Sequence, residues 1–362
     1  MASNQELLLG VGGFGVVTLS TDKDDDKYLV AHKEIKNFDN HLFTREINSF
    51  RALDRYGFVK MIRYQDDIDH GHPAYIDMDF IPGGDLSQLL NAEASQANIP
   101  LFDITQKMII AYGTARSLKI MHDNHFIHRD IKPDNILLDH KLRPYLTDFG
   151  LSRKIAPTQQ QVTNVGTLNY MSPEILAGQN NVTNKSDVHM FGMLLYEMFN
   201  NEFPYVGLSD HAIIHNIIHG ILPEIKKPSL IDDLFKKCCQ LSPENRPDFE
   251  EVANEIIKIV NSSNVVSQTT FMKYKKFYDK QATLIGDDIP RCGTINFLRQ
   301  AADNDIPFAL YKYGTMLQNG YIVEKDESLG KEYIRRAIML LKLEEEETTD
   351  EDYSEEDGID IE

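Results

Sequence analysis

The sequence predicts an α+β protein that begins with strands and continues into helices. Residues 9–20 and 28–36 alternate in hydrophobicity or are rich in β-branched residues, as strands do. Residues 40–54 instead place apolar side chains at helical spacing, and similar spacing returns in 269–281 and 291–343. With 362 residues and a hydrophobic content of 42%, the chain is long enough to bury a substantial core.

The charge of the chain is concentrated at its C-terminus. The formal net charge is −19, but residues 344–362 alone carry twelve Asp and Glu and no Lys or Arg. The rest has 37 Lys and Arg against 44 Asp and Glu, which argues against a nucleic-acid binder because no basic excess is present. We therefore predict a globular body followed by a disordered acidic tail over 344–362.

Cysteine usage and apolar runs predict where the protein resides. The three cysteines cannot form a disulfide framework and lack metal-ligand spacing, which favours a reducing compartment. The N-terminal apolar run is too short for a signal peptide, and no stretch approaches the roughly 18 apolar residues of a membrane helix. These features predict a cytoplasmic protein without a membrane partner, and a nuclear location stays open.

A glycine-rich segment, LGVGGFGVV over 9–17, fits the pattern G-x-G-x-x-G-x-V. A purely structural turn is the alternative, and the pattern alone does not decide between them. A dinucleotide site would need the glycines to lead into a helix, but the residues that follow are β-branched and alternating. We therefore expect an antiparallel hairpin whose backbone N–H groups can cover phosphates.

One lysine and one glutamate are predicted to pair inside the protein. In the strand over 28–36, Ala31 and Lys33 share one face. In the following helix, Glu46 lies on the same stripe as Phe50 and Leu53, so it faces protein rather than water. A buried carboxylate needs a cation, and Lys33 is the candidate, the alternative being two independent surface charges.

The segment 74–90 reads as a strand that breaks at a Pro-Gly-Gly sequence and enters a helix. A chain that stops pairing at this point leaves backbone groups around residues 79–81 available. Such groups can form hydrogen bonds with a flat heterocycle.

Two polar motifs follow: HRDIKPDN over 128–135 and LTDFG over 146–150. A polar turn is the plain interpretation of either one alone. Together, downstream of the glycine hairpin and the strand with Lys33, they resemble the eukaryotic protein kinase family over residues 5–260. The resemblance implies a bilobal fold, with a small β-rich N-lobe and a helical C-lobe.

The resemblance assigns roles in phosphoryl transfer from ATP, a reaction that depends on positioning and charge neutralisation. It implies that Asp130 accepts the proton of the attacking hydroxyl and that Lys132 balances charge on the γ-phosphate. Asn135 and Asp148 would bind Mg²⁺, and Lys33, fixed by Glu46, would contact the α- and β-phosphates. The implied ATP site comprises Leu9, Gly10, Gly12, Gly13, Gly15, Val17, Ala31, Lys33, Met78, Asp79, Ile81, Asp85 and Leu137.

The substrate class follows from the same resemblance. Lys132 and the segment GTLNYMSPE over 166–174 are similar to serine/threonine kinases, with the tyrosine-kinase-like group as the nearest in detail. Protein substrates are therefore expected. Glu174 and Arg246 are expected to form a buried ion pair, and Asp187 to cap the backbone of the catalytic loop.

Regulation is also implied. Kinases with an arginine before the catalytic aspartate, here Arg129, commonly depend on a phosphate in the loop that follows Asp148. Thr163 and then Thr158 are the expected switch sites, while Thr167 resembles the residue that contacts the catalytic pair. A loop that is active without modification is the alternative.

A catalytically silent adaptor is the competing function, although the departures from the family pattern, such as an aspartate at 77, leave the transfer residues intact.

The C-terminal part is predicted to be helical. Residues 261–290 form a linker with a helix over 269–281 that docks on a neighbour; RNA contact is the alternative. Residues 291–343 carry small and aromatic residues, among them Ala301, Gly314, Gly320 and Tyr333, at the positions where Sel-one-like repeats place them. The segment therefore resembles these repeats, which are relatives of tetratricopeptide repeats. One such unit cannot bury its apolar face alone, so it should pack on the 269–281 helix, on the kinase lobe or on another chain. It would then recruit a partner protein or act as a stabilising cap.

Overall fold

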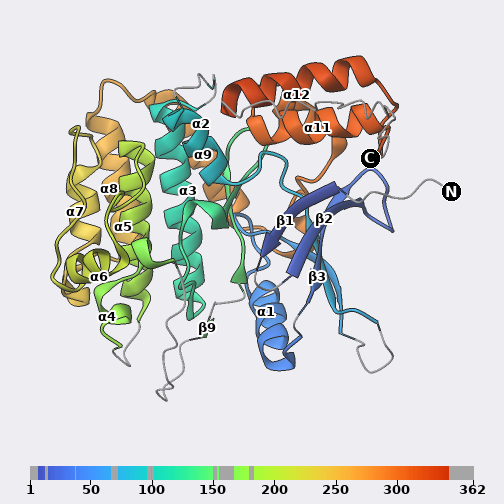
Figure 1. The fold of residues 1–362 in the computed structure, drawn as a ribbon. Helices are drawn as coiled ribbons and strands as arrows, with labels where there is room; N and C mark the ends of the chain where they lie inside the picture. Colours follow the sequence, from blue (N-terminus) through green and yellow to red (C-terminus); the bar gives the residue numbers. More distant parts are fainter. Residues whose placement is uncertain are drawn as a thin grey trace, which may run out of the picture.

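The computed structural model of the protein describes residues 7–12, 15–36, 38–66, 72–95, 99, 102–149, 153–154, 167–178 and 183–341 (Figure 1). The expected acidic tail, Gly13, Thr158 and Thr163 lie outside these residues. Within the described parts, no helix has the length and apolar character needed to cross a membrane.

The N-terminal lobe is a five-stranded antiparallel sheet with the strand order β1-β2-β3-β5-β4. Its strands are β1 (Leu7–Gly12), β2 (Gly15–Thr21), β3 (Leu29–Ile35), β4 (Met61–Gln65) and β5 (Tyr75–Asp79). The glycine segment joins β1 to β2, as the sequence predicted, and a Cβ at Gly15 would lie 1.9 Å from the Glu34 carbonyl oxygen. Only glycine fits this close approach of two strands.

Helix α1 (Asn40–Ala52) is the helix of this lobe, and it begins where Asp39 accepts a hydrogen bond from the Leu42 amide, a typical N-cap. Its buried face carries Phe43, Ile47 and Phe50, together with Glu46. The helical period predicted from the sequence therefore places Glu46 toward the interior of the protein.

The second lobe is helical and includes two short β-ladders near the interlobe cleft, so the expected α+β bilobal fold is confirmed. Most residues of its central helix α3 are buried, and the helix is capped by Asp103. The helices are α2 (Leu86–Ala94), α3 (Ile104–Asp123), α4 (Pro173–Leu176), α5 (Asn184–Asn200), α6 (Asp210–Ile218), α7 (Asp232–Cys238) and α8 (Phe249–Ser262). The ladders pair β6 (Phe126–Ile127) with β9 (Arg153–Lys154) and β7 (Ile136–Leu138) with β8 (Pro144–Leu146).

Beyond α8 the chain first docks on the helical lobe. Helix α9 (Gln268–Gln281) places the Phe271 ring 5.4 Å from the Tyr112 ring of α3. The Tyr278 hydroxyl lies 2.9 Å from the hydroxyl of Ser117, also in α3. The sequence predicted a docking helix here, and that prediction is confirmed.

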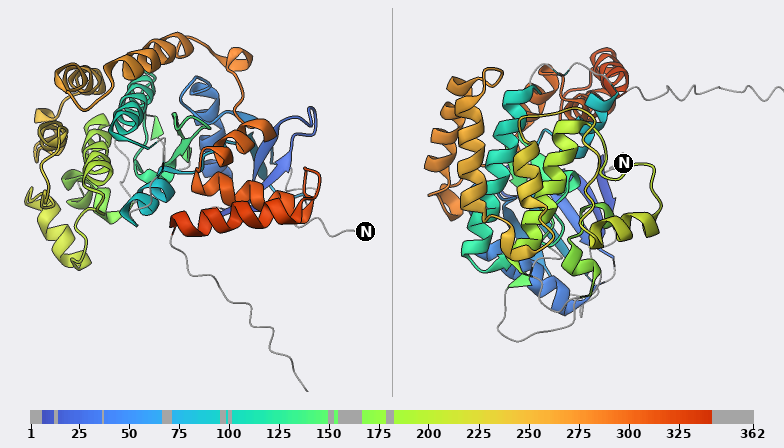
Figure 2. Two further views of the ribbon diagram at one scale, coloured as in Figure 1. Left: turned by 90° about the horizontal axis from the view of Figure 1, so that it is seen from above. Right: turned by 90° about the vertical axis from the view of Figure 1, so that its left-hand side faces the viewer.

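The chain then crosses to the N-terminal lobe, where α10 (Ile295–Asp303), α11 (Pro307–Asn319) and α12 (Glu327–Leu341) follow. Both figures place the red α11–α12 pair beside the blue sheet (Figures 1 and 2). The two helices approach closely because Gly314 faces Gly330: a Cβ on Gly330 would lie 2.7 Å from the Gly314 carbonyl oxygen. The pair lies against α2 of the helical lobe and is hydrogen-bonded to β1 and β2 of the other lobe, so it contacts the preceding domain, one of the packing partners that the sequence left open.

Candidate active site

A cavity of about 470 Å³ opens between the two lobes. Residues from the glycine hairpin, β3, α1, the connection after β5 and the loops after β6 and β8 meet there. The predicted residues that line it are Leu9, Gly10, Gly15, Val17, Ala31, Lys33, Glu46, Met78, Asp79, Ile81, Asp85, Asp130, Lys132, Leu137 and Asp148. Gly12 is the last residue of β1, and Asn135 contacts the lining residue Asp130 through a side-chain hydrogen bond.

Asp130 is held at the cavity by three neighbours. The Asn135 amide nitrogen donates to the Asp130 carbonyl at 2.7 Å and to its Oδ2 at 2.9 Å. The Lys132 ammonium lies 3.3 Å from Oδ2, and the Thr167 amide donates to Oδ1 at 3.4 Å. Lys132 also donates to the Thr167 hydroxyl at 3.0 Å, so Thr167 contacts both Asp130 and Lys132, as expected.

Asp187 of α5 fixes the backbone next to Asp130. Its carboxylate accepts hydrogen bonds from the amides of His128 at 2.8 Å and Arg129 at 2.9 Å. Arg129 has a φ of 73°, a left-handed conformation that costs about 1–3 kcal/mol for a residue with a side chain. The buried Asp187 carboxylate stabilises this turn, which confirms the capping contact that the sequence predicted.

At the inner wall, the Lys33 ammonium lies 2.8 Å from Glu46 Oε1. The two side chains are 12% and 8% exposed, so the ion pair lies in a mostly dry environment where electrostatic attraction is strong. The predicted pair is therefore confirmed. Although only thirteen residues separate Lys33 from Glu46, helix α1 begins early enough to present Glu46 to the cavity.

Asp148 and Asn135 can supply oxygen ligands to a metal. Asp148 lines the cavity with a φ of 59°, and Phe149 beside it is fully buried, with its ring 5.0 Å from that of Phe50 in α1. The Asn135 amide nitrogen is used by Asp130, which leaves its oxygen Oδ1 as an acceptor. One carboxylate and one amide oxygen fit Mg²⁺, which keeps waters and takes substrate phosphates as its further ligands.

The other end of the cavity is apolar. Ala31, Val17 and Leu9 line it on the N-lobe side, Leu137 on the C-lobe side, and Met78 is 8% exposed at its rear. Such a slot fits a flat ring system.

The backbone after β5 forms the edge of this apolar slot. The Asp79 amide donates to the Lys60 carbonyl at 2.8 Å and that of Phe80 to Leu29 at 3.4 Å. These two amides are used in backbone pairing, so they are not among the available backbone groups that the sequence predicted around residues 79–81. Among the described backbone hydrogen bonds none has the Ile81 amide as donor, so it is the candidate donor to a heterocycle.

Asp85 lies at the outer side of the slot as the N-cap of α2. Its Oδ1 accepts from the Ser87 hydroxyl at 2.6 Å and the Gln88 amide at 3.0 Å. Burial raises the pKa of Asp85 above its usual value, although these two hydrogen bonds act to lower it. The carboxylate is thus positioned by α2, with Oδ2 as the oxygen that neither bond uses.

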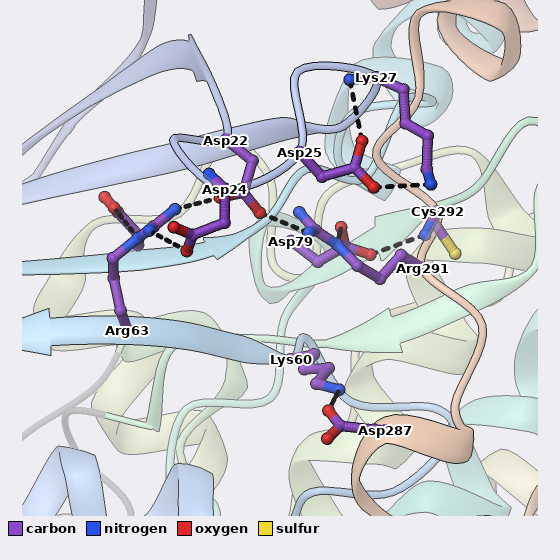
Figure 3. A network of polar contacts seen from close by, with 11 residues as sticks. Asp22, Asp24, Asp25, Lys27, Lys60, Arg63, Asp79, Asp287, Arg291 and Cys292 are labelled. Carbon is purple, nitrogen blue, oxygen red and sulfur yellow. Dashed lines mark hydrogen bonds and ion pairs between the residues drawn. The ribbon is translucent and has the colours of Figure 1, made fainter.

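Sequence reasoning missed a network that joins the connection after β5 to the C-terminal segment (Figure 3). Arg291 donates from Nε to Asp79 Oδ1 at 3.0 Å and from Nη1 to Asp22, while the Cys292 amide donates to Asp79 Oδ2 at 2.7 Å. Asp79 is 4% exposed and Asp22 5% exposed. The sequence YIDMD over 75–79 could have indicated this network. Carboxylates that are buried in a central strand need cationic partners, which other parts of the chain must supply.

The predicted structural ion pair also forms. Arg246 is fully buried and contacts Glu174 through two hydrogen bonds of 2.8 and 2.9 Å. Burial alone would raise the pKa of Glu174, but the Arg246 hydrogen bonds and charge outweigh it and hold the pKa well below its usual range. The pair connects α4 to the loop before α8.

Comparison with known proteins agrees with this geometry. Residues 3–257 match the family model described as "Protein kinase domain". The chain is 35% identical over 173 residues to the RGS domain-containing serine/threonine-protein kinase A of Dictyostelium discoideum, covering 46% of this chain and 15% of that protein. It is 30% identical over 269 residues to the serine/threonine-protein kinase pakB of the same organism, covering 71% and 30%. It is 38% identical over 205 residues to the receptor-like kinase LIP2 of Arabidopsis thaliana, covering 54% and 36%. The chain thus spans about a third or less of the length of these relatives.

Proposed function

The chain belongs to the protein kinase family, and we propose that it transfers the γ-phosphate of ATP to serine or threonine hydroxyls of protein substrates. One observation carries the proposal: Asp130, Lys132 and Asp148 line the same cavity as the Lys33–Glu46 pair, with Asn135 hydrogen-bonded to Asp130. The whole transfer apparatus that the family requires is therefore within reach of one ligand.

The proposal gives each residue a role that is consistent with its position. Asp130 would accept the hydrogen bond and proton of the attacking hydroxyl, with Asn135 and Lys132 fixing its orientation. Lys33, held by Glu46, would bind the α- and β-phosphates. Asn135 and Asp148 would hold Mg²⁺, which when bound would neutralise charge on the phosphate oxygens.

Support for serine and threonine as acceptors comes from the Lys132–Thr167 hydrogen bond of 3.0 Å and from the printed names of relatives such as pakB. Assignment to the tyrosine-kinase-like group is part of the proposal. Phosphorylation of Thr163 or Thr158 would then switch the enzyme through Arg129, which adjoins Asp130.

The C-terminal helix pair is proposed to be a Sel-one-like repeat that binds a partner protein. The close approach of Gly314 to Gly330 and the positive φ of 68° at Gly320 support this, because Gly314 and Gly320 are among the small residues that carry the resemblance to such repeats. A cytoplasmic location is proposed as well. It is supported by Cys238, Cys239 and Cys292, all free buried thiols, which suit a reducing compartment.

The proposal is tested by phosphate transfer from magnesium-ATP to a generic protein substrate and to the protein itself. Asp130→Asn and Asp148→Asn should each lower the rate by about 100-fold or more, since they remove proton acceptance and metal binding. Asp210→Asn, an exposed carboxylate at the start of α6, is the matched control and should be unaffected.

Nucleotide binding is measured separately as a shift in melting temperature, because a ligand that binds only the folded form stabilises it. If the wild type transfers phosphate no faster than the two active-site variants, the enzyme proposal fails. A kinase-fold adaptor then becomes the better interpretation.

A further inference from the structure

The cavity between the lobes has one lining residue that comes from the C-terminal helices. Phe308, in the first turn of α11, contributes to the same cavity as Lys33 and Asp130. Building on the proposed function, we propose that Phe308 is a nucleotide-binding residue that contacts the nucleoside part of ATP. The C-terminal helix pair would then be a component of the active site and not only a separate recruitment module.

Phe308 packs directly on the connection between the lobes. Its ring centroid lies 6.3 Å from that of Phe80. Gly84 leaves the space that Phe308 occupies: a Cβ on Gly84 would lie 2.6 Å from Phe308 Cγ, and Gly84 also has a φ of 74°. Any larger residue at position 84 would push Phe308 out of the cavity wall. Gly84 and Phe308, which are 224 positions apart in the sequence, therefore have complementary sizes at this contact.

The helix that carries Phe308 is anchored to the glycine hairpin. The Lys312 ammonium, one turn further along α11, donates a hydrogen bond to the Leu8 carbonyl of β1. The Tyr321 hydroxyl donates to the Leu19 carbonyl of β2 at 2.9 Å. Ile306 and Pro307 on either side of the helix start are buried. These contacts hold Phe308 at a fixed place relative to both the hairpin and the connection after β5.

The position of Phe308 decides which part of ATP it can meet. Phe308 lies against Gly84, which also lies close to Gln88 and directly precedes Asp85, and all three line the cavity at the outer end of the slot. The phosphate-binding groups Lys33 and Asp148 belong to the inner wall. An uncharged aromatic ring at the outer end can pack on a ribose or on the edge of a purine, and it offers nothing to a phosphate.

The test compares three ligands by calorimetry: magnesium-ATP, adenosine and magnesium tripolyphosphate. Phe308→Ala should weaken ATP and adenosine by the same factor, about 5- to 30-fold, which is the usual effect of removing a ring that packs on a base. Tripolyphosphate binding should not change. Tyr311→Ala on the same helix is the matched control, because Tyr311 is 43% exposed and is not among the lining residues.

A second measurement uses the absence of tryptophan from the sequence. Phe308→Trp places a single tryptophan in the cavity wall, and its emission, excited selectively over that of the 16 tyrosines, should shift when adenosine binds. Tyr311→Trp should not respond. This readout does not depend on whether Phe308→Ala keeps its stability, which is checked by its melting temperature without nucleotide.

The outcomes separate the inference from the proposed function. If the wild type binds no ATP, the proposed function fails. If the wild type binds ATP but Phe308→Ala binds adenosine equally well, or if Phe308→Trp does not respond to adenosine, the inference is overturned. Equal weakening of tripolyphosphate would also overturn it, because Phe308 would then act through the arrangement of the lobes.

Discussion

At the scale of single residues, Glu197 in α5 has an unusual environment. Its side chain accepts a hydrogen bond from the Tyr170 hydroxyl, which belongs to the segment that follows Thr167. Burial raises the pKa of Glu197 to about 7, with a smaller contribution from Asp134, and the Tyr170 hydrogen bond opposes the shift. The native protein therefore keeps this proton to a higher pH than the unfolded chain does.

This shift predicts a pH-dependent stability. Between the usual pKa of 4.5 and the folded value of about 7, the native state binds more protons than the unfolded state, so the free energy of unfolding falls as pH rises. From the shift, the loss is about 3 kcal/mol, complete above pH 7. Glu197→Gln keeps a hydrogen-bond acceptor for Tyr170 and removes the titration.

Urea denaturation at pH 5 and pH 8 checks this prediction. The free energy of unfolding of Glu197→Gln relative to wild type should be higher at pH 8 than at pH 5. A relative stability that is the same at both pH values would contradict it, because then Glu197 does not titrate in this window.

At the scale of elements, the sequence predicted what depends on local pattern. The hairpin β1–β2, the pairing of Lys33 with Glu46 and the helix near 269–281 all follow from periodicity over short stretches. The contacts between distant elements did not follow. Arg291 binds Asp79 across 212 positions, and Phe308 reaches the cavity from the predicted repeat. No periodic pattern predicts such contacts, because each of the two residues could pair with many other residues of the chain.

The α11–α12 pair also gives an element-scale prediction. Gly314→Val should force the helices apart, because a Cβ at 314 would lie 2.9 Å from the Gly330 carbonyl oxygen and 2.9 Å from the Ile334 side chain. Overpacking of this kind costs about 1–3 kcal/mol. Amide hydrogen exchange in 307–341 should accelerate.

Met339→Val is the control in the same helix pair, since Met339 is 67% exposed. It should leave hydrogen exchange in 307–341 close to that of the wild type. If Gly314→Val exchanges no faster than Met339→Val, the helices can separate without loss and the close contact does not stabilise the pair.

At the scale of the whole molecule, the C-terminal segment connects the two lobes. Helix α9 is fixed to α3 of the helical lobe, whereas the following residues bind the other lobe. There, Lys60 donates to the Gly286 carbonyl at 3.1 Å, and the Leu29 amide donates to the Gly293 carbonyl at 2.6 Å. Arg291 adds its two ion pairs (Figure 3). Both lobes and the C-terminal segment should therefore unfold as one cooperative unit.

Arg291→Ala tests this connection. It leaves the Asp79 carboxylate, 4% exposed, without its arginine, and removing one partner of a buried ion pair costs about 3–5 kcal/mol. Burial already raises the pKa of Asp79, so losing Arg291 should raise it further and make the defect larger at higher pH. Denaturation monitored by both circular dichroism and amide exchange should show the N-terminal lobe and residues 285–341 destabilised together.

The second substitution in a double-mutant cycle identifies the cause. Asp79→Asn removes the buried charge, so in the Arg291→Ala background it should recover part of the lost free energy of unfolding, although it destabilises the wild type. Arg335→Ala, an exposed arginine of α12, is the control and should cost little. Two outcomes would contradict the prediction: Arg291→Ala is as stable as Arg335→Ala, or residues 285–341 exchange faster while the N-terminal lobe does not. In either case the ion pairs of Arg291 would not stabilise the C-terminal segment against the N-terminal lobe.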